Sequence, residues 1–592
     1  MIRRSLWIAV AVMLALPFGA QANDELMILQ DDPGQWTLPG KNYSANRYST
    51  LNQITTRNVK NLKAEWTFSL GVLRGQEGAP LVVGTTMYVH TGFPNNVYAL
   101  DLTREGAPIK WAYKPSQDPS VPAVACCDTV YRGLAYANGK IFLAQLDTNV
   151  VAIDAATGRE IWKVTQGDPA QGMTITAAPL VIKDNVITGI SGGEFGVRGF
   201  VTANNINTGE QVWRAYSAGP DTDVLIGDEF SSPYESHQGA DLGVTTWDGD
   251  EWTRGGGTTW GWYTYDPDLN LLYYSTGNPG AWNPTQRPGD NKWSMTIFAR
   301  NPDTGMARWA YQMTPHDEWD YDGVNENILA DLEINGETRQ TLVHFDRNGF
   351  GYTIDRATGE VLVAEKFGAV NWADGVDLET GLPIRVAEKG TEAGRNSKDI
   401  CPAAIGAKDQ QPAAYSPKTG LFYVPTNNIC MDYEGVPVKY QAGQWYVGAI
   451  VRMFAGPGGN RGEFIAWDAT TGEKKWGIKE NLAAYGGALV TETNVVFYGT
   501  MEGWLKAVNA KTGELLWRFK TGSGIIANPM TYLGPDGKQY VAVISGVGGW
   551  AGVAVALDIG PEDPTAGLGA LGAFGDAGMH STKGAMLYVF GL

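Results

Sequence analysis

The phrase AIDAATGREIW, residues 152–162, recurs along this 592-residue chain. Each copy reads Ala-x-Asp or Ala-x-Asn, then Thr-Gly, then Trp four residues after the Gly. The other clear copies are ANNINTGEQVW (203–213), ARNPDTGMARW (299–309), AWDATTGEKKW (466–476) and AVNAKTGELLW (507–517). Weaker copies are ALDLTREGAPIKW (99–111), YDPDLNLLYYS (265–275), IDRATGEVL (354–362) and AYSPKTGLFYV (414–424).

Each copy predicts a strand, a tight turn at Thr-Gly and a second strand, because alternating residues such as Val150 and Ala152 are apolar. One such unit cannot bury both of its faces alone, and the copies are too numerous for a two-sheet sandwich. With four strands and roughly 50–70 residues per repeat, the chain has room for about eight blades. We therefore predict an all-β fold, a single eight-bladed β-propeller over residues 23–592. The Trp of each phrase is expected to dock between neighbouring blades.

The first 22 residues have the features of a secretory signal peptide. Arg3 and Arg4 precede the apolar run 6–18, and Ala20-Gln21-Ala22 offers small residues for cleavage. The apolar run of about 13 residues is shorter than the roughly 20 that a spanning helix needs. We predict a signal peptide over residues 1–22 and a mature, soluble, exported chain without a membrane span.

Four cysteines suit an oxidising compartment. Cys401 and Cys430 are expected to form a disulfide, with two free buried thiols as the alternative. Cys126 and Cys127 are adjacent, and neighbouring Cα atoms lie about 3.8 Å apart, closer than ordinary disulfides prefer. From composition alone, this pair is either a strained bridge at a functional site or two reduced core thiols.

Composition also excludes several classes of protein. The chain has a formal net charge of −18 and no basic cluster, so it is not expected to bind nucleic acid. GLGALG (567–572) matches a dinucleotide fingerprint formally but follows no βαβ pattern, and the haem motif C-x-x-C-H is absent. Five scattered His residues offer no zinc or iron spacing.

The stretch HDEWDYDGVNEN (316–327) points instead to a hard cation. Asp320 and Asp322 aim two carboxylates the same way in an extended chain, and like charges repel unless a cation lies between them. Oxygen ligands favour a hard metal ion, although the third acid and the closing Glu of an EF-hand are missing. From its residues alone, the protein is an exported β-propeller with a carboxylate cation site.

A set of longer motifs resembles the large subunit of the pyrroloquinoline quinone (PQQ) methanol dehydrogenases, over essentially the whole mature chain. The family fold, an eight-bladed propeller, agrees with the repeat count. The most specific motifs are CCDTVYRGLAY (126–136) and TTWGWYTYDP (258–267). The others are LRGQEGAPLV (73–82), GISGGEFGVRG (189–199), STGNPGAWNP (275–284), HDEWDYDGVNEN (316–327), DRNGFGYTIDR (346–356) and GVGGWAGV (546–553).

The resemblance implies a site for PQQ. A disulfide between Cys126 and Cys127 would cover one face of the quinone, and Trp260 would stack on the other. Trp282 would border the alcohol pocket and favour short alcohols. The rim of the quinone would be bound by Glu77, Arg132, Thr176, Ser191, Gly192, Thr258, Arg347, Asp409 and Trp550.

The resemblance also implies a metal site. The family's metal ligands fall on Glu194, Asn278 and Asp320, and calcium-dependent members have a small uncharged residue where this chain has Asp322. A further carboxylate favours a trivalent ion, so Asp322 resembles the extra ligand of the lanthanide-dependent branch (La³⁺ or Ce³⁺ class). The alternative is that Asp322 is a solvated turn residue before Gly323.

The implied reaction is oxidation of methanol and other short primary alcohols to aldehydes. Asp320 would act as general base and Arg347 would stabilise charge on the quinone. The family implies a periplasmic location, a c-type cytochrome as electron acceptor and, for the lanthanide type, a homodimer. The alternatives are a calcium-dependent PQQ alcohol dehydrogenase of the ethanol type and, from a different class, a non-catalytic periplasmic scaffold propeller.

Overall fold

A computed structural model describes residues 23–592 of the chain. The predicted signal peptide, residues 1–22, lies outside the described residues. Among the described residues, no helix combines the length and the apolar character that crossing a bilayer requires. Strands dominate, and the α-helices are short, beginning with α1 (Asp24–Asp31).

Eight sheets of four or more strands form the body of the described chain. In each sheet the strands are antiparallel neighbours, apart from the short β1 (Tyr48–Ser49), which adds a parallel edge to one of them. The first four sheets are β3 to β6 (Leu81–Val83, Thr86–His90, Val97–Asp101, Ile109–Tyr113), β7 to β10 (Ala135–Ala137, Lys140–Ala144, Asn149–Asp154, Glu160–Thr165), β11 to β14 (Leu180–Ile182, Asn185–Gly189, Phe200–Asn205, Gln211–Tyr216) and β15 to β18 (Tyr263–Asp266, Leu271–Ser275, Thr296–Arg300, Ala307–Gln312).

The remaining sheets continue in chain order. They are β19 to β22 (Asn327–Ile334, Glu337–Phe345, Phe350–Asp355, Val361–Lys366), β26, β27, β30 and β31 (Ala414–Ser416, Leu421–Asn427, Gly462–Asp468, Glu473–Glu480), β32 to β35 (Ala488–Thr491, Val495–Gly499, Trp504–Asn509, Leu515–Lys520), and β36, β37, β38 and β2 (Met530–Leu533, Gln539–Ser545, Met586–Gly591, Lys63–Ser69). The predicted all-β, eight-bladed propeller is confirmed.

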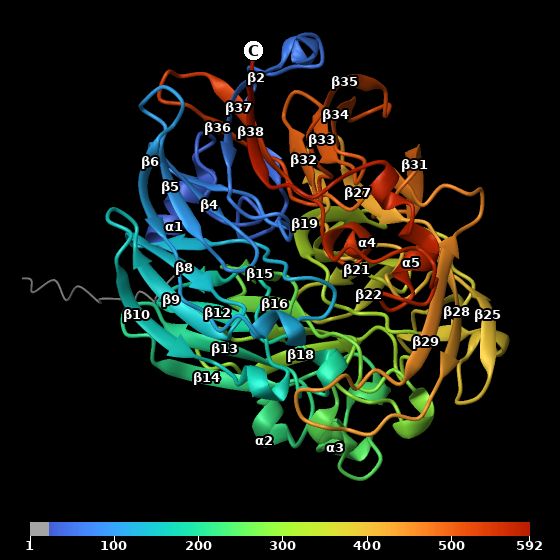
Figure 1. Ribbon diagram of the computed structural model, residues 1–592. Coiled ribbons are helices and arrows are strands. Elements are labelled where there is room, and N and C mark those ends of the chain that lie inside the picture. Colours follow the sequence, from blue (N-terminus) through green and yellow to red (C-terminus); the bar gives the residue numbers. More distant parts are fainter. Residues whose placement is uncertain (1–22) are drawn as a thin grey trace, which may run out of the picture.

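The two ends of the described chain share the last blade. Strand β2, near the N-terminus, pairs antiparallel with β38 at the C-terminus, from Lys63 opposite Gly591 to Ser69 opposite Met586. Figure 1 shows β36 to β38 next to the strands of the first blade, so the ring of blades is closed by joining its ends.

The Trp of four of the five clear phrases docks on the following blade through its indole N–H, as predicted, and the fifth, Trp517, packs edge-to-face on Phe590 of β38. Trp162 donates its indole N–H to the carbonyl of Ile206 at 3.0 Å, and a Cβ built on Gly209 would meet its ring at 2.8 Å. The same indole-to-carbonyl bond joins Trp111 to Ala155, Trp213 to Pro302, Trp309 to Arg356 and Trp476 to Ala510. The Thr-Gly turn therefore supplies both the glycine surface and the carbonyl that receive the Trp of the preceding blade.

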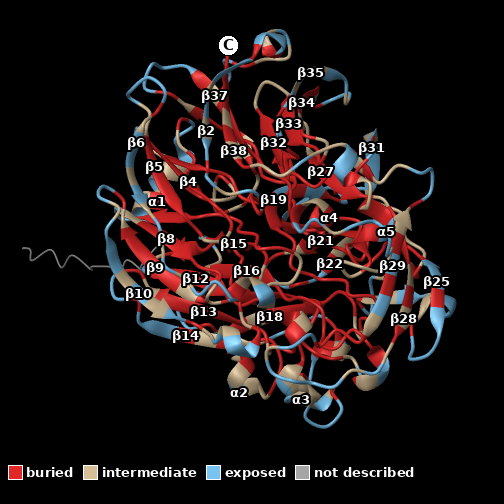
Figure 2. Cartoon of the chain, viewed as in Figure 1, coloured by how far each residue is buried: buried red, intermediate tan, exposed pale blue. Residues whose placement is uncertain are grey.

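In most blades, burial falls from the inner strands to the outer ones, although the outer strand β18 stays almost fully buried. Strands such as β4 and β12 are buried throughout, whereas β6, β10 and β35 show exposed residues along their length. Figure 2 shows this change from the buried interior to the exposed rim. The core thus surrounds the central region from which the functional loops project.

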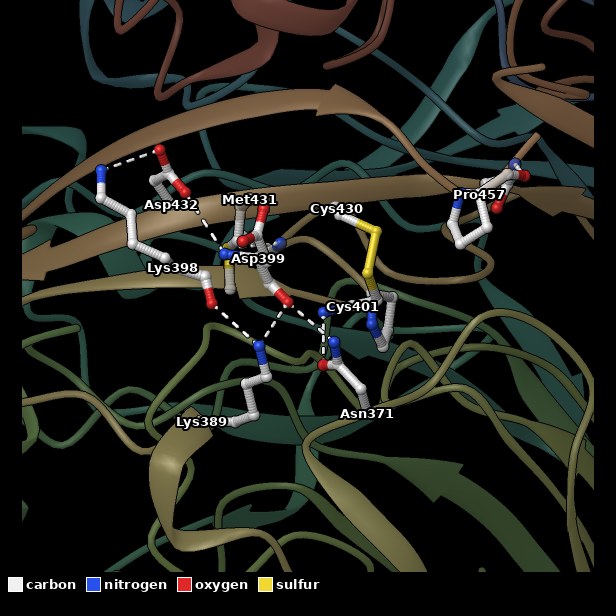
Figure 3. Close-up of a disulfide and its surroundings, with 12 residues drawn as sticks. Asn371, Lys389, Lys398, Asp399, Cys401, Cys430, Met431, Asp432 and Pro457 are labelled. Carbon is white, nitrogen blue, oxygen red and sulfur yellow. Dashed lines mark hydrogen bonds and ion pairs between the residues drawn. A yellow bond between two sulfur atoms is a disulfide. The ribbon is translucent and has the colours of Figure 1, made fainter. Parts of the chain in front are cut away.

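Two small sheets are inserted into the ring, one after the blade that ends in β22 and the other largely within the blade of β26, β27, β30 and β31. One is the hairpin of β23 (Ala373–Asp377) and β24 (Leu382–Arg385), and the other consists of β25 (Asn396–Ile400), β28 (Ile429–Gly435) and β29 (Ala449–Ala455). The predicted Cys401–Cys430 disulfide is present and joins the end of β25 to β28. In Figure 3, the Cys401 N–H donates to Asn371 at 2.8 Å, and Lys398 pairs with Asp432 at 2.9 Å.

Candidate active site

One cavity gathers nearly all of the predicted site residues. Its walls are Glu77, Ala125, Cys126, Cys127, Val130, Arg132, Thr174, Thr176, Ser191, Gly192, Glu194, Trp260, Trp282, Asp320, Asp322, Arg347, Asp409, Tyr485 and Trp550. Most of these residues precede the first strand of a blade, as Glu77 precedes β3, or follow its second strand, as Ser191 follows β12. In an antiparallel pair these two positions lie at the same end, so the blades present their loops together.

Two predicted residues, Thr258 and Asn278, do not line the cavity directly. They lie behind Gly193, because a Cβ built there would come 3.2 Å from Asn278 Oδ1 and 3.5 Å from Thr258 Oγ1. Asn278 is tied to the site through its backbone N–H, which donates to Asp322 Oδ1 at 2.7 Å.

Cys126 and Cys127 are bonded to each other and line the cavity together with Trp260. The sequence left open whether this pair forms a strained disulfide or two reduced thiols, and the structure has the disulfide. The guanidinium carbon of Arg132 lies 4.4 Å from the centroid of the Trp260 ring. A disulfide and an indole in one cavity offer the apolar surfaces that a flat aromatic ligand requires.

Arg132 also organises the polar rim. It pairs with Glu77 at 2.8 Å and donates to Thr176 Oγ1 at 2.8 Å, and Thr176 Oγ1 lies 3.1 Å from Ser191 Oγ. Burial raises the pKa of Glu77 to about 7, although the charge of Arg132 opposes the shift. This chain of charged and hydroxyl groups can bind carboxylates and carbonyls at the edge of a planar ligand.

Arg347 is a second cationic centre of the site. Its Nη1 lies 3.0 Å from Asp322 and 3.9 Å from Asp320, and its Nε and Nη2 lie 3.1 and 2.5 Å from Asp409 Oδ1. The second oxygen of Asp409 accepts a hydrogen bond from the Tyr485 hydroxyl. Burial lowers the pKa of Arg347, but the charges of Asp409 and Asp322 outweigh it and raise the pKa overall.

Three further acids of the cavity, Glu194, Asp320 and Asp322, are buried close enough to raise one another's pKa. Burial and the charge of Asp322 raise the pKa of Glu194 to about 7. Burial, followed by the charges of Asp322 and Glu194, raises the pKa of Asp320 well above its ordinary value. Asp322 is only 3% exposed, so it is not a solvated turn residue, and burial raises its pKa although Arg347 opposes the shift.

The donor set fits a hard cation. Asp320 Oδ1 is buried and has no hydrogen-bond partner, and Asp320 itself adopts a left-handed backbone with φ of +64°. A cation beside these oxygens would favour their charged forms and reverse the cost of burying them together. Across residues 23–592, however, no three His, Cys, Asp or Glu side chains form a metal-binding group. The exact ligand set of Glu194, Asn278, Asp320 and Asp322 stays a prediction.

Four residues of the cavity wall were not predicted from the sequence: Ala125, Val130, Thr174 and Tyr485. Of these, Tyr485 has a hydroxyl that is bonded to Asp409. Tyr485 is 1% exposed and lies three residues before the start of β32. Its place before the first strand of a blade, which Glu77, Trp260 and Asp409 share, is the signal that could have found it. Trp282, expected beside the alcohol, also lines the cavity, with its ring centroid 6.1 Å from that of Trp550.

A propeller whose blade loops surround a cavity walled by buried acids, two arginines, an indole and a disulfide has the features of a cofactor-binding oxidoreductase of the quinoprotein class. Residues 36–370 and 477–541 match the family described as "PQQ: Glucose/ethanol/alcohol dehydrogenase, beta-propeller domain". The chain belongs to this family.

Individual relatives agree with this membership. The chain is 58% identical over 579 residues to the "Lanthanide-dependent methanol dehydrogenase" of Methylacidiphilum fumariolicum (strain SolV), covering 97% of this chain and 95% of the relative. It is 50% identical to "Methanol dehydrogenase [cytochrome c] subunit 1" of Methylorubrum extorquens, covering 98% of this chain and 94% of that protein. The solved structure of a "Europium-containing methanol dehydrogenase" superposes with a TM-score of 0.95 at 58% identity, covering 96% of this chain and all of that one (100%).

Proposed function

We propose that this protein oxidises methanol and other short primary alcohols to aldehydes, with PQQ as electron acceptor and a lanthanide ion as Lewis acid. The observation that carries the proposal is the burial of Asp322 beside Asp320, Glu194 and Arg347. Coulomb attraction scales with the charge on the ion, so a third carboxylate favours a trivalent cation over Ca²⁺. The similarity to lanthanide-dependent methanol dehydrogenase supports the same conclusion.

The reaction divides between cofactor and protein. PQQ supplies the two-electron acceptor and the lanthanide ion supplies the Lewis acid that activates it. Asp320 offers an unpartnered oxygen to the cavity, where it accepts the hydroxyl proton of the alcohol. Arg347 faces the same space as a permanent cation and offsets the negative charge that builds up during oxidation. Glu194, Asn278 and Asp322 would join Asp320 in the oxygen set that holds the metal ion.

Binding and selection fall to the other walls. Cys126–Cys127 and Trp260 provide apolar faces for the flat cofactor, and Trp282 reduces the space left for the alcohol. Pocket contacts of one or two methylenes are worth about 1–3 kcal/mol, so methanol and ethanol are both expected as substrates. The edge of the cofactor is held by Glu77, Arg132, Thr176, Ser191, Gly192, Thr258, Asp409 and Trp550.

The experiment compares protein made in a PQQ-producing host with La³⁺ or with Ca²⁺ alone. Dye reduction with methanol should require La³⁺, and Asp322→Ala should lower the La³⁺-supported rate by roughly 100-fold, at the upper end of metal-site substitutions. Asp268→Ala is the matched control, because it removes an exposed carboxylate that does not line the cavity. It should leave the rate unchanged. Full activity with calcium alone would favour the calcium-dependent reading, and purified protein without a quinone absorption band would favour the scaffold.

We further propose that residues 1–22 direct export and are removed, and that the mature domain, 23–592, works in the periplasm. Intact-mass measurement of the periplasmic protein tests this proposal. The mass should be that of a chain starting near Asn23. A chain that keeps Met1 in the cytoplasm would overturn this assignment.

The electron acceptor is proposed to be a c-type cytochrome, supported by the similarity to methanol dehydrogenase [cytochrome c] subunit 1. Reduction of a purified periplasmic c-type cytochrome by methanol and enzyme should be visible in its α-band. We also propose a homodimer, which light scattering of the purified protein would distinguish from a monomer.

A further inference from the structure

Gly277 lies against the carboxylate of Asp322. A Cβ built on Gly277 would come 2.2 Å from Asp322 Oδ1 and 3.3 Å from Asp322 Cγ. Non-bonded carbon and oxygen atoms cannot approach this closely without displacement. Gly277 is not among the residues with positive φ, so its backbone does not itself require glycine. The need for glycine here is steric, and Asp322 is its cause.

Asp322 has little freedom to move away. Its Oδ1 accepts the Asn278 backbone N–H at 2.7 Å, and its Oδ2 pairs with Arg347 Nη1 at 3.0 Å. The side chain is 4% exposed, so any other rotamer would have to displace packed atoms. The dipeptide Gly277-Asn278 is therefore a cradle: Gly277 leaves the space for the carboxylate and Asn278 holds it.

The second contact of the added Cβ would be milder. It would lie 3.2 Å from the carbonyl oxygen of Thr258, which an adjustment of a few tenths of an ångström relieves. An alanine at position 277 should therefore fit once the Asp322 carboxylate is absent. This gives the two positions a testable dependence on each other.

We propose that Gly277 is a specificity-determining position for the metal ion, because it allows the Asp322 carboxylate to stand in the cation site. This inference rests on the proposed function, in which Asp322 selects a trivalent ion. It adds a residue that carries no donor atom of its own and that acts only through the room it leaves. Gly277→Ala should thus imitate the loss of a ligand although every ligand is still present.

The test is a double-mutant cycle of Gly277→Ala, Asp322→Ala and the double variant, in PQQ-containing protein stripped of metal by a chelator. Tb³⁺ affinity is read from tryptophan-sensitised luminescence, and Ca²⁺ affinity from competition with Tb³⁺. Each single variant should lose roughly 10- to 100-fold in Tb³⁺ affinity, in the range of substitutions that disturb metal ligands, and less in Ca²⁺ affinity. The double variant should bind Tb³⁺ like Asp322→Ala alone, because positions in contact are not additive.

Thermal unfolding of the metal-free variants provides a second readout that does not depend on the metal. Gly277→Ala should lower the melting temperature, and adding Asp322→Ala should recover part of the loss by removing the clash. Gly375→Ala is the matched control, since a Cβ there meets nothing within 4 Å and its φ is not positive.

Two results would overturn the inference. The first is wild-type Tb³⁺ affinity in Gly277→Ala, and the second is a double variant in which the two losses add in full. If Asp322→Ala weakens Tb³⁺ binding while either result holds, the proposed function stands and only the role of Gly277 fails. If Asp322→Ala binds Tb³⁺ normally, the lanthanide part of the proposed function fails first.

Discussion

Arg347 is held on one side by a chain of two further residues, Asp409 and Tyr485. Both Nε and Nη2 donate to one oxygen of Asp409, and the other oxygen of Asp409 is held by the Tyr485 hydroxyl. Without that hydroxyl, a buried carboxylate oxygen would lose its donor and Asp409 would be free to rotate away from Arg347. Tyr485 is therefore a positioning residue for a catalytic cation.

We predict that Tyr485→Phe lowers kcat for methanol by roughly 10- to 100-fold, since hydrogen bonds to charged groups are worth about 1.5–3 kcal/mol. Lanthanide content should stay unchanged, because Tyr485 holds no predicted metal ligand. Steady-state kinetics and metal analysis measure the two quantities. Tyr498→Phe is the control, since Tyr498 also donates to a carboxylate, at Glu480, outside the cavity. An unchanged kcat in Tyr485→Phe would show that Asp409 positions Arg347 without help from Tyr485.

Glu77 should make the stability of the quinone-free protein depend on pH. Its pKa is about 7 in the folded protein, against an ordinary value of 4.5, mainly because it is buried. Between these values the folded protein keeps a proton that the unfolded chain has released. Stability from this group is thus present below about pH 4.5 and is lost as the pH rises towards 7.

We predict that Glu77→Gln reduces the decline in stability between pH 4.5 and 7 by up to roughly 3 kcal/mol, the equivalent of the shift in pKa. Chemical denaturation of both proteins at several pH values measures the difference. Other buried acids, including Glu194, shift in the same direction, so only the comparison of the two proteins isolates Glu77. Parallel stability curves for the two proteins would contradict the prediction.

The residues of the site were largely predictable where they lie in distinctive motifs. Cys126, Trp260 and Asp320 belong to such motifs, and the structure brings them to one cavity. The pairing of Arg347 with Asp322 and Asp409 was not predictable, because these loops belong to different blades and sequence spacing gives no distances between them. Tyr485 was missed because its stretch, AAYGGALV, resembles an ordinary strand entry.

At the scale of the element, the glycine of the Thr-Gly turn has two roles: it adopts a left-handed backbone, and it leaves room for the Trp of the preceding blade. Gly359 has φ of +82°, as the turn requires, and a Cβ added there would meet the Trp309 ring at 2.8 Å. Gly420 occupies the same kind of turn with φ of +70°, but a Cβ added there meets nothing within 4 Å. Alanine at Gly420 should therefore cost only the free energy of a left-handed alanine, whereas alanine at Gly359 should also disturb the Trp309 contact.

We predict that Gly420→Ala costs about 1 kcal/mol, the penalty for a left-handed alanine. Gly359→Ala should cost about 1–3 kcal/mol more, because the docked indole must also shift. The measurement is the melting temperature of the two variants, which should fall further for Gly359→Ala. Equal shifts would mean that the Trp contact adds nothing to the role of the turn.

The Thr-Gly-Trp spacing predicted these strands and turns, but not their irregularities. The ladder between β9 and β10 shifts register between Glu160 and Trp162, and similar shifts occur in the other seven blades. Alternation of apolar residues cannot reveal an extra residue in one strand. The inserted sheet of β25, β28 and β29 was equally unforeseen, since only its disulfide had a sequence signal.

At the scale of the whole molecule, the ring is closed by β2 and β38 from opposite ends of the chain. This closure determines the site, because Glu77 follows β2 and Trp550 precedes β38. The backbone N–H of Gly549 lies 3.3 Å from Asp128 Oδ2, so the last blade is bonded to the loop that carries the disulfide. The number of blades was predictable from the repeat count, whereas the strand that joins the ends carries no repeat phrase.

We predict that a chain ending at Ala585, which lacks β38, neither closes nor retains PQQ. Val589 and Phe590 are fully buried, and β38 lies between β2 and β37 in the sheet. Its removal therefore exposes apolar surface and two strand edges. A chain ending at Gly591 lacks only the half-exposed Leu592 and should behave as the intact protein. Quinone absorbance and melting temperature measure the outcome.

Adding a synthetic peptide of residues 586–592 to the shorter chain should restore both the quinone absorbance and the melting temperature, because the strand pairs on both sides without a covalent link. A shorter chain that holds the quinone without the peptide would show that the remaining blades position Trp550 and Glu77 by themselves.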